Sequence, residues 1–326
     1  MHFVRSKIAS PFQLEKPVNP INFAGRQTVL KNIRQIVGNM LVGSPSQALL
    51  CGQSGMGKTS LLHYLRNTYS QKKLLVIDIE NPVSTSDFII QIVEVILKKS
   101  VKEPHYMKIR GLFEDSIIAD KSEKEIYDLK DNKLIPRNDL KFMPDYDELE
   151  YLKGNFHEIL KEVSSLLRLS KGMIITVDDI DYLAEDMEFI KWYADFGFNL
   201  NGLDDARFAV FLTLKPDYLR ELYLANPDFK KIFKVYGLNQ LLYKEVEVFY
   251  KNIFSRLKIK ISSKSISKMA KASKGIPFLM EEIGDAVYWN CDGIVISEQD
   301  VDTGIVDAGK ITFSYQIRDE IAEYSK

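Results

Sequence analysis

Residues 52–59 read Gly-Gln-Ser-Gly-Met-Gly-Lys-Thr, which is the complete spacing of a phosphate loop. Glycines at these positions let the backbone curl so that its N–H groups point at phosphate oxygens. Lys58 is expected to reach the β- and γ-phosphates, and the hydroxyl of Thr59 is expected to bind Mg²⁺. At average residue frequencies a chance match occurs in only about one chain in a hundred of this length. We therefore expect the phosphates of a nucleotide to be held by Gln53, Ser54, Gly55, Met56, Gly57, Lys58, Thr59 and Ser60.

A second group of polar residues follows the apolar run MIITV, where the sequence continues as Asp178, Asp179, Ile180 and Asp181. Asp178 is expected to hold the Mg²⁺ through water, and Asp179 is expected to act as the general base that orients the attacking water. Acids at the end of a strand are also common as solvated or capping groups. This alternative stays open, more so for Asp179 than for Asp178. We expect Asp181 to be structural.

Thr213 lies near the end of another apolar run, RFAVFLTLKP. Its hydroxyl could contact the γ-phosphate or the attacking water, although a threonine in a buried strand can equally serve packing alone. Lys215 is a similar candidate with less support. The candidate catalytic residues are thus Lys58, Asp179 and Thr213.

Four short apolar runs are predicted to be strands, namely QALLC, KLLVIDIE at 73–80, MIITVDDID and RFAVFLTLKP. Segments with apolar residues at helical spacing alternate with them, among them 29–40 and 149–167. This alternation indicates a parallel sheet with helices on both faces, in which right-handed connections bring all the strand ends to one edge. The glycine-rich loop and the acids both fall at that edge, where ligands bind in such sheets.

The composition is that of an ordinary globular protein of 326 residues, with 45% hydrophobic residues, 27% charged residues and a net charge of −1. The two cysteines, Cys51 and Cys291, have no metal-ligand spacing around them and suit a reducing compartment. Because neither a secretion signal nor an apolar run of membrane-spanning length is present, we expect a soluble cytoplasmic protein without a membrane partner. DNA binding would need a local basic patch. The lysine-rich segment 251–274 is a candidate, although a solvated helix face is the commoner explanation.

The segment FAGRQTVLKNI resembles the motif that precedes the phosphate loop in AAA+ and STAND ATPases, and Gly275-Ile276-Pro277 resembles the Gly-x-Pro element of the STAND lid. With the loop, the acids and the strand RFAVFLTLKP, these motifs make residues 18–290 similar to ATPases of the archaeal-ATPase type. The resemblance implies an α/β P-loop NTPase fold of the ASCE class, with a five-stranded parallel sheet between helices and a C-terminal helical lid. It also implies that ATP or ADP binds with Mg²⁺, with Gly25 and Arg26 beside the adenine and ribose and Pro277 against the base.

On this resemblance the chain divides into an N-terminal arm at 1–20, an ATPase core at 21–237, a helical lid at 238–300 and a tail at 301–326. The core is expected to contain an insertion at 100–145, because this segment is charged, of mixed sign and only weakly periodic. Some local helix is expected within it.

Two departures from the family pattern affect the expected activity. Ring-forming AAA+ proteins usually carry an arginine finger where this sequence has Lys230, Lys231 and Lys234, and a lid arginine where it reads GIPFLMEE. Both departures favour slow ATP hydrolysis in which the nucleotide state sets the conformation. We expect a switch ATPase that controls assembly with a partner protein or with further copies of itself, in signalling or defence. The alternatives are a DNA-associated AAA+ ATPase, similar to a replication initiator or a transposition regulator, and a nucleotide-binding scaffold that does not hydrolyse ATP.

Overall fold

The computed structural model describes residues 9–14, 16–113, 117–118, 127–128, 133–134 and 141–310. The chain folds as two compact units, each assembled from separate segments. The sheet unit consists of Thr28–Gly52 and Leu65–Gly237, and the helical unit consists of Met1–Gln27, Gln53–Tyr64 and Leu238–Lys326. Within the described ranges, no helix combines the length and the apolar character needed to cross a membrane.

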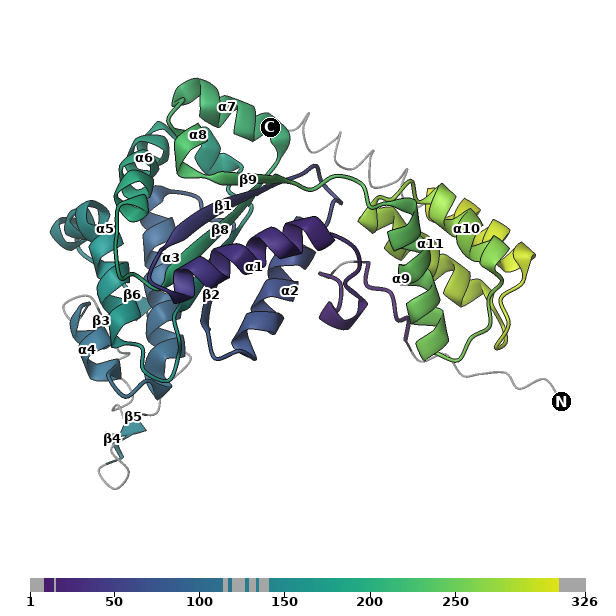
Figure 1. Cartoon of the computed structure of the whole chain (residues 1–326), viewed down its shortest axis with the longest axis horizontal. Helices are drawn as coiled ribbons and strands as arrows, with labels where there is room; N and C mark the ends of the chain where they lie inside the picture. Colours follow the sequence, from purple (N-terminus) through teal and green to yellow (C-terminus); the bar gives the residue numbers. More distant parts are fainter. Residues whose placement is uncertain are drawn as a thin grey trace. The chain divides into compact units, whose positions relative to one another are not determined.

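A five-stranded parallel sheet with the strand order β2-β7-β8-β1-β9 forms the centre of the sheet unit (Figure 1). Residues of β1 and β8 are buried over the whole length of both strands, as expected for parallel strands that carry helices on both faces. The edge strand β9 is short and largely exposed. The strands are β1 (Ser46–Cys51), β2 (Leu75–Glu80), β7 (Met173–Asp178), β8 (Phe208–Leu214) and β9 (Lys234–Gly237).

One face of the sheet packs against three helices and forms the larger hydrophobic core. Successive side chains of a strand point to opposite faces, so this core takes alternate residues such as Leu49 of β1 and Ile175 of β7. Aromatic rings around Trp192 and Tyr193 fill the space between the helices. The helices are α3 (Thr85–Lys99), α5 (Tyr146–Leu166) and α6 (Met187–Asn201).

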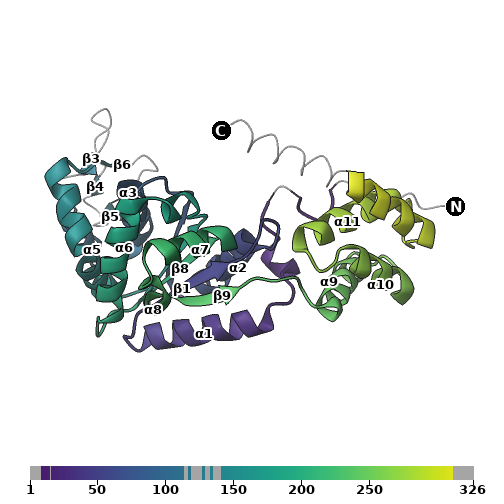
Figure 2. The same cartoon turned by 90° about the horizontal axis from the view of Figure 1, so that it is seen from above.

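The opposite face of the sheet carries a polar strip. The helix α1 (Gln27–Leu41) runs along the strands on this side (Figure 2). Arg66 of α2 (Lys58–Ser70) forms an ion pair with Asp78 of β2 at 2.5 Å, and the hydroxyl of Thr176 in β7 donates to the same carboxylate at 2.6 Å. Two residues further along each strand, Glu80 pairs in register with Asp178. The strip therefore leads along the strands to their carboxyl ends.

The remaining elements of the sheet unit are short. The segment 100–145, predicted to be an insertion with local helix, contains a helix and two small antiparallel ribbons, β3 with β6 and β4 with β5. Its elements are η2 (Ser100–Lys102), α4 (Tyr106–Gly111), β3 (Ile117–Ile118), β4 (Tyr127–Asp128), β5 (Lys133–Leu134) and β6 (Lys141–Phe142). Connections to the later strands hold η4 (Tyr182–Ala184), α7 (Pro216–Ala225) and α8 (Phe229–Ile232).

The helical unit has its own hydrophobic core, built from α9 (Tyr243–Arg256), α10 (Ser263–Ala272), α11 (Pro277–Asn290) and a further helical segment at 298–310. The N-terminal segment, which includes η1 (Pro20–Asn22), contributes Phe12 to this core. The Phe12 ring is only 4% exposed and packs against Phe249, Tyr250 and Phe254 of α9. Burial of an aromatic ring of this kind contributes about 2–3 kcal/mol, so the N-terminal segment is part of the folded unit.

The predicted fold class is confirmed, with a five-stranded parallel sheet, helices on both faces and a helical C-terminal region. All four predicted strands are present, and the fifth strand, which only the resemblance implied, is β9. Residues 301–310, predicted as part of a tail, are helical, and Val301 and Ala308 are buried in the core of the helical unit. Residues 311–326 of that predicted tail and residues 1–8 of the predicted arm lie outside the described residues.

Candidate functional site

The phosphate loop follows β1 directly and leads into α2. Gly55 and Gly57 have φ angles of 76° and 80°, a region that residues with a side chain rarely adopt. The N–H of Met56 donates to the carbonyl of Gln53 at 3.2 Å and closes the turn. Lys58 begins α2, and its Nζ lies 3.4 Å from the same Gln53 carbonyl oxygen. The spacing seen in the sequence thus produces the curled backbone that a phosphate loop requires.

Arg26 holds the loop from the side. Its guanidinium donates to the carbonyl of Met56 at 2.9 Å and to the carbonyl of Asn239. Burial lowers the pKa of Arg26, and the nearby carboxylate of Glu245 opposes this shift. Gly25 lies against the side chains of Leu241 and Glu245. Arg26 therefore fixes the loop backbone, and the predicted contacts of Gly25 and Arg26 with a nucleotide remain predictions.

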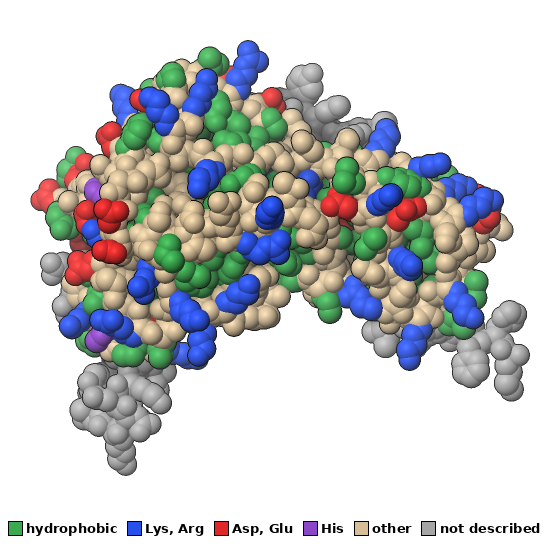
Figure 3. Space-filling model, viewed as in Figure 1, with side chains coloured by type: hydrophobic (Ala, Val, Ile, Leu, Met, Phe, Trp, Pro, Cys, Tyr) green, Lys and Arg blue, Asp and Glu red, His purple; other side chains and the backbone are tan. Residues whose placement is uncertain are grey.

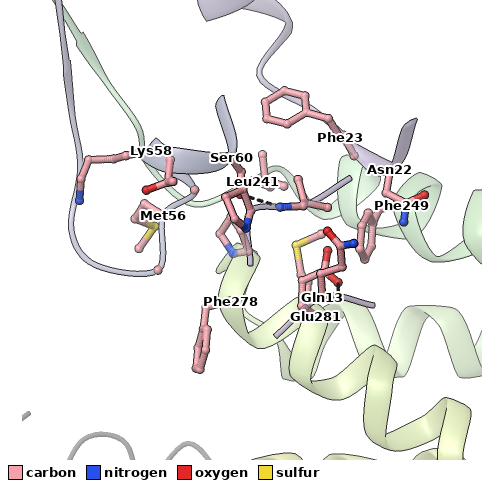
Figure 4. A pocket seen from close by; sticks show the side chains of 18 of the residues that line it. Gln13, Asn22, Phe23, Met56, Lys58, Ser60, Leu241, Phe249, Phe278 and Glu281 are labelled. Atoms are coloured by element: carbon pink, nitrogen blue, oxygen red, sulfur yellow. Dashed lines mark hydrogen bonds between the residues drawn. The ribbon is translucent and has the colours of Figure 1, made fainter. Parts of the chain in front are cut away.

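A cavity of about 360 Å³ lies beside the loop within the helical unit. Its walls come from the N-terminal segment, the loop, the start of α2 and the helices α9 and α11. Lys58 and Met56 lie at one side of the close view, whereas Asn22, Phe249 and Glu281 lie at the other (Figure 4). The predicted site residues that line the cavity are Arg26, Gly55, Met56, Gly57, Lys58, Thr59, Ser60 and Pro277.

Hydrogen bonds join the three segments around the cavity. The N–H of Val18 donates to Oγ of Ser60 at 3.1 Å, which ties the N-terminal segment to the start of α2. The N–H of Phe278 at the start of α11 donates to the carbonyl of Gly55 at 3.2 Å. The carbonyl of Gly275, which lies just before α11, accepts the N–H of Leu241 at 2.7 Å. Phe278 thus holds the beginning of α11 against the loop, and Gly275 is bonded to Leu241, which lies just before α9.

Glu281 on α11 is an ionisable group in the wall of this cavity that sequence reasoning did not identify as functional. It is only 8% exposed, and one of its carboxyl oxygens accepts the backbone N–H of Gln13 at 2.9 Å. Burial raises the pKa of Glu281 to about 7, and the negative charge of Asp285 adds to this effect. A carboxyl group with this pKa is partly neutral near physiological pH.

The carboxyl end of the sheet carries a compact set of hydrogen bonds around Thr213. Its hydroxyl, which has no exposed surface, donates to Oδ1 of Asp178 at 2.5 Å and accepts the backbone N–H of Asp179 at 2.8 Å. Asp179 has a φ of 56°, so the chain turns sharply directly after Asp178. Thr213 therefore fixes the orientation of both acids. Its predicted contact with a phosphate or with the attacking water stays a prediction.

Asp179 belongs to a second charged group formed with Asp181 and Lys215. The carboxylate of Asp179 accepts the N–H of Asp181 at 3.3 Å. Asp181, which is buried, accepts the N–H of Lys215 at 2.9 Å and forms an ion pair with its Nζ at 2.9 Å. Burial raises the pKa of Asp179, the charge of Asp181 adds to this, and Lys215 opposes it. Asp181 is thus tied to Lys215 at the end of β8, and the catalytic role predicted for Asp179 stays a prediction.

The residues at the loop and the cavity fit a nucleotide. The curled loop offers backbone N–H groups and the ammonium of Lys58 for phosphates. Apolar side chains such as Phe23, Phe249 and Met280 line the cavity and can hold a flat base. The hydroxyl of Thr59 and the carboxylate of Asp178 are oxygen donors of the kind that Mg²⁺ prefers.

A family model for the AAA ATPase domain matches residues 22–192, which is more than half of the chain. The chain belongs to the AAA ATPase domain family. The match includes the phosphate loop, the acids at the end of β7 and, of the N-terminal cavity wall, residues 22–26. Thr213, α9 and α11 lie beyond the matched residues. Only the structure places Thr213 beside the acids and the two helices in the cavity wall.

Comparison with the solved structure of a Walker-type ATPase supports the fold of this AAA ATPase. A Walker-type ATPase of Pyrococcus abyssi has a similar structure with a TM-score of 0.57, over 98% of this chain and 79% of that chain, at 14% identity. The Orc1 protein of Aeropyrum pernix, solved in complex with DNA, gives a TM-score of 0.49 over 86% of this chain and 65% of that chain, at 14% identity. An uncharacterised HTH-type transcriptional regulator of Methanocaldococcus jannaschii is 32% identical over 104 residues. That segment is 31% of this chain and only 25% of the regulator.

Proposed function

We propose that this AAA ATPase binds ATP with Mg²⁺, hydrolyses it slowly, and uses the nucleotide state to control assembly with a partner protein or with further copies of itself. The observation that carries the proposal is the glycine-curled loop ending in Lys58 and Thr59, beside a cavity whose walls come from the N-terminal segment and the helical lid. Because the nucleotide would contact all three segments, its presence would bias how they are held together.

The chain offers a residue for each part of the reaction. Lys58 would bind the β- and γ-phosphates, and Thr59 and Asp178 would hold Mg²⁺, which supplies charge neutralisation at the phosphates when bound. Asp179 would take the proton of the attacking water, and its raised pKa suits that role. Thr213 would keep both acids in place through its two hydrogen bonds.

Where ring-forming AAA+ proteins carry an arginine finger, this chain has lysines, and the contacts that these lysines make favour slow turnover. Lys231 forms an ion pair with Asp228 at 2.9 Å, and Nζ of Lys230 lies 5.4 Å from the ring centroid of Tyr223. Both lysines therefore have partners within their own chain. This supports a switch in which hydrolysis resets the state, as in STAND ATPases, over a ring-type motor.

The primary test is a Lys58→Ala variant, measured by equilibrium titration with ATP and ADP. Removal of the ammonium should abolish nucleotide binding while the fold stays intact, because the side chain of Lys58 lies at the site. Circular dichroism and thermal unfolding serve as controls for the fold. Submicromolar ATP affinity in the variant would contradict the phosphate-loop assignment.

Hydrolysis and switching need separate measurements. Single-turnover phosphate release distinguishes the proposed ATPase from a scaffold that binds ATP without hydrolysis. The Asp179→Asn variant should still bind ATP but should no longer release phosphate from it. Mass measurement of the protein with ADP and with a non-hydrolysable ATP analogue then shows whether ATP drives assembly, and equal masses in the two states would argue against self-assembly.

A DNA-associated ATPase remains the second candidate, because α10 carries lysines along one side and a relative is named as a transcriptional regulator. Two of these lysines, however, pair with acids of the segment 298–310: Lys264 with Glu298 at 2.9 Å, and Lys268 with Asp302. Lys and Arg side chains of the helical unit are interspersed with Asp and Glu on the visible face (Figure 3). ATPase rates with and without duplex DNA at two salt concentrations would decide, since phosphate contacts are strongly salt-dependent.

A further inference from the structure

The cavity beside the phosphate loop has two chemically different ends. Lys58 and the loop glycines mark the end for phosphates, and Glu281 lies at the other side with Phe249, Asn22 and Gln13 (Figure 4). A nucleotide whose phosphates contact the loop would therefore extend its base toward Glu281. This inference rests on the proposed binding of a nucleotide at the loop.

Glu281 stands out among the polar groups at the base end. The amide of Asn22 is already engaged, since its Nδ2 donates to the carbonyl of Pro11 at 3.1 Å and its Oδ1 accepts from Arg256. One carboxyl oxygen of Glu281, Oε2, accepts the N–H of Gln13, and the other oxygen, Oε1, can bind a ligand. A carbonyl oxygen can accept two hydrogen bonds, so the group retains capacity on both oxygens.

We propose that the carboxyl group of Glu281 recognises the base of the bound nucleotide and selects adenine. In its neutral form the group donates its O–H to N1 of adenine, and its carbonyl oxygen accepts one N–H of the 6-amino group. Guanine presents two donors at the corresponding edge, N1–H and the 2-amino group. These would need the ionised carboxylate, which is costly to bury in this wall.

The charges around Glu281 act in both directions. Asp285 and Glu282 lie on the same helix, and the hydroxyl of Tyr250 on α9 donates to the carbonyl of Met280 next to Glu281. The charge of Asp285 favours the neutral carboxyl group of Glu281, as does burial, whereas the N–H of Gln13 favours the ionised form. The cations that line the same cavity are Lys16, Arg26 and Lys58. Burial, the charge of Asp285 and the N–H of Gln13 together give Glu281 a pKa of about 7, so protonation of this residue and adenine binding should be linked.

The test compares dissociation constants for ATP and GTP at about pH 6.5 and about pH 8.5 in the wild-type protein, Glu281→Gln and Glu281→Leu. The wild type should bind ATP more tightly than GTP and lose about twentyfold in ATP affinity at the higher pH, because the neutral fraction of a carboxyl group with a pKa of about 7 falls by about that factor between the two pH values. Glu281→Gln keeps one donor and one acceptor at every pH, so it should retain tight ATP binding without that loss. Glu281→Leu should bind ATP weakly at both pH values and lose the preference over GTP.

Three results would overturn the proposal: GTP binding as tight as ATP in the wild type, the same pH dependence in Glu281→Gln as in the wild type, or a full ATP preference in Glu281→Leu. Glu298→Gln removes a surface carboxylate of the same unit and controls for the change in net charge. If the wild type binds neither nucleotide, the proposed function itself fails. If it binds ATP normally and the Glu281 variants do so too, only the role of Glu281 fails.

Discussion

Thr213 has one hydroxyl and no exposed surface, yet it serves two acids at once. It donates to the carboxylate of Asp178 and accepts the N–H of Asp179. A hydroxyl can donate only one hydrogen bond, so its proton is committed to Asp178 in this arrangement. At the scale of single residues, we therefore regard Thr213 as a positioning residue for the acids.

Thr213→Val keeps the shape of the side chain and removes the hydroxyl. Because the partly buried carboxylate of Asp178 and the N–H of Asp179 then lose a partner, the free energy of unfolding should fall by about 1–3 kcal/mol. Urea unfolding measures this loss. Single-turnover hydrolysis should slow down, whereas the dissociation constant for ATP, which depends mainly on the loop and the cavity, should change little. An unchanged rate would show that the acids do not need this support.

The loop residues can be predicted from the sequence because a phosphate loop is defined by local spacing, which a single sequence displays. Glu281 could not be found in this way. In the sequence it is one of two adjacent glutamates on a helix, a pattern typical of a solvated surface. Its burial and its bond to Gln13 depend on contact between residues 268 positions apart.

At the scale of elements, strands and helices with a local apolar pattern can be predicted from the sequence, whereas those that depend on contacts between distant segments cannot. The four predicted strands are apolar runs that the sheet buries. The fifth strand, β9, has only four residues and is mostly exposed, so it shows no apolar run. Residues 301–310, predicted as part of a tail, belong to a helical segment at 298–310 in which Val301 is fully buried. Burial by distant segments thus decides the elements that local patterns do not show.

The N-terminal segment offers a test at this scale, because α11 accommodates the Phe12 ring only through the absence of a side chain at Gly284. A Cβ at Gly284 would lie 2.2 Å from the Phe12 ring. Gly284→Ala should therefore displace the segment and destabilise the protein by about 1–3 kcal/mol through overpacking, although alanine normally favours a helix. Thermal unfolding and limited proteolysis of residues 9–23 measure the effect.

The matched control is Gly309→Ala, at a helical position where an added Cβ meets nothing within 4 Å. This substitution should be neutral or slightly stabilising. Equal stability of the two variants would show that the contact between Phe12 and Gly284 does not hold the segment in place.

At the scale of the whole molecule, the helical unit consists of three segments that are far apart in the sequence. The cavity takes wall residues from each of them. A ligand in the cavity therefore stabilises the three segments together. The gain is about 2.7 kcal/mol at a ligand concentration one hundred times the dissociation constant.

Hydrogen–deuterium exchange with and without ATP can measure this coupling. Protection should rise together in the segments 9–24, 53–64 and 241–290. The buried strands β1 and β8 should change little, because they line no part of the cavity. Protection confined to 53–64 would mean that the nucleotide contacts the loop alone.

The division of the helical unit into three segments also constrains how the chain can mature. The sheet gains its last strand, β9, at residue 237, whereas the cavity still lacks Leu241, Phe249, Pro277 and Glu281 at that point of synthesis. A chain emerging from the ribosome can thus complete its sheet before the helices that pack against the segments 9–27 and 53–64 have been synthesised. Contacts between segments so far apart in the sequence form slowly. The phosphate loop would then be present before its binding site is complete. A nucleotide would therefore bind only after α9 and α11 have been synthesised and folded.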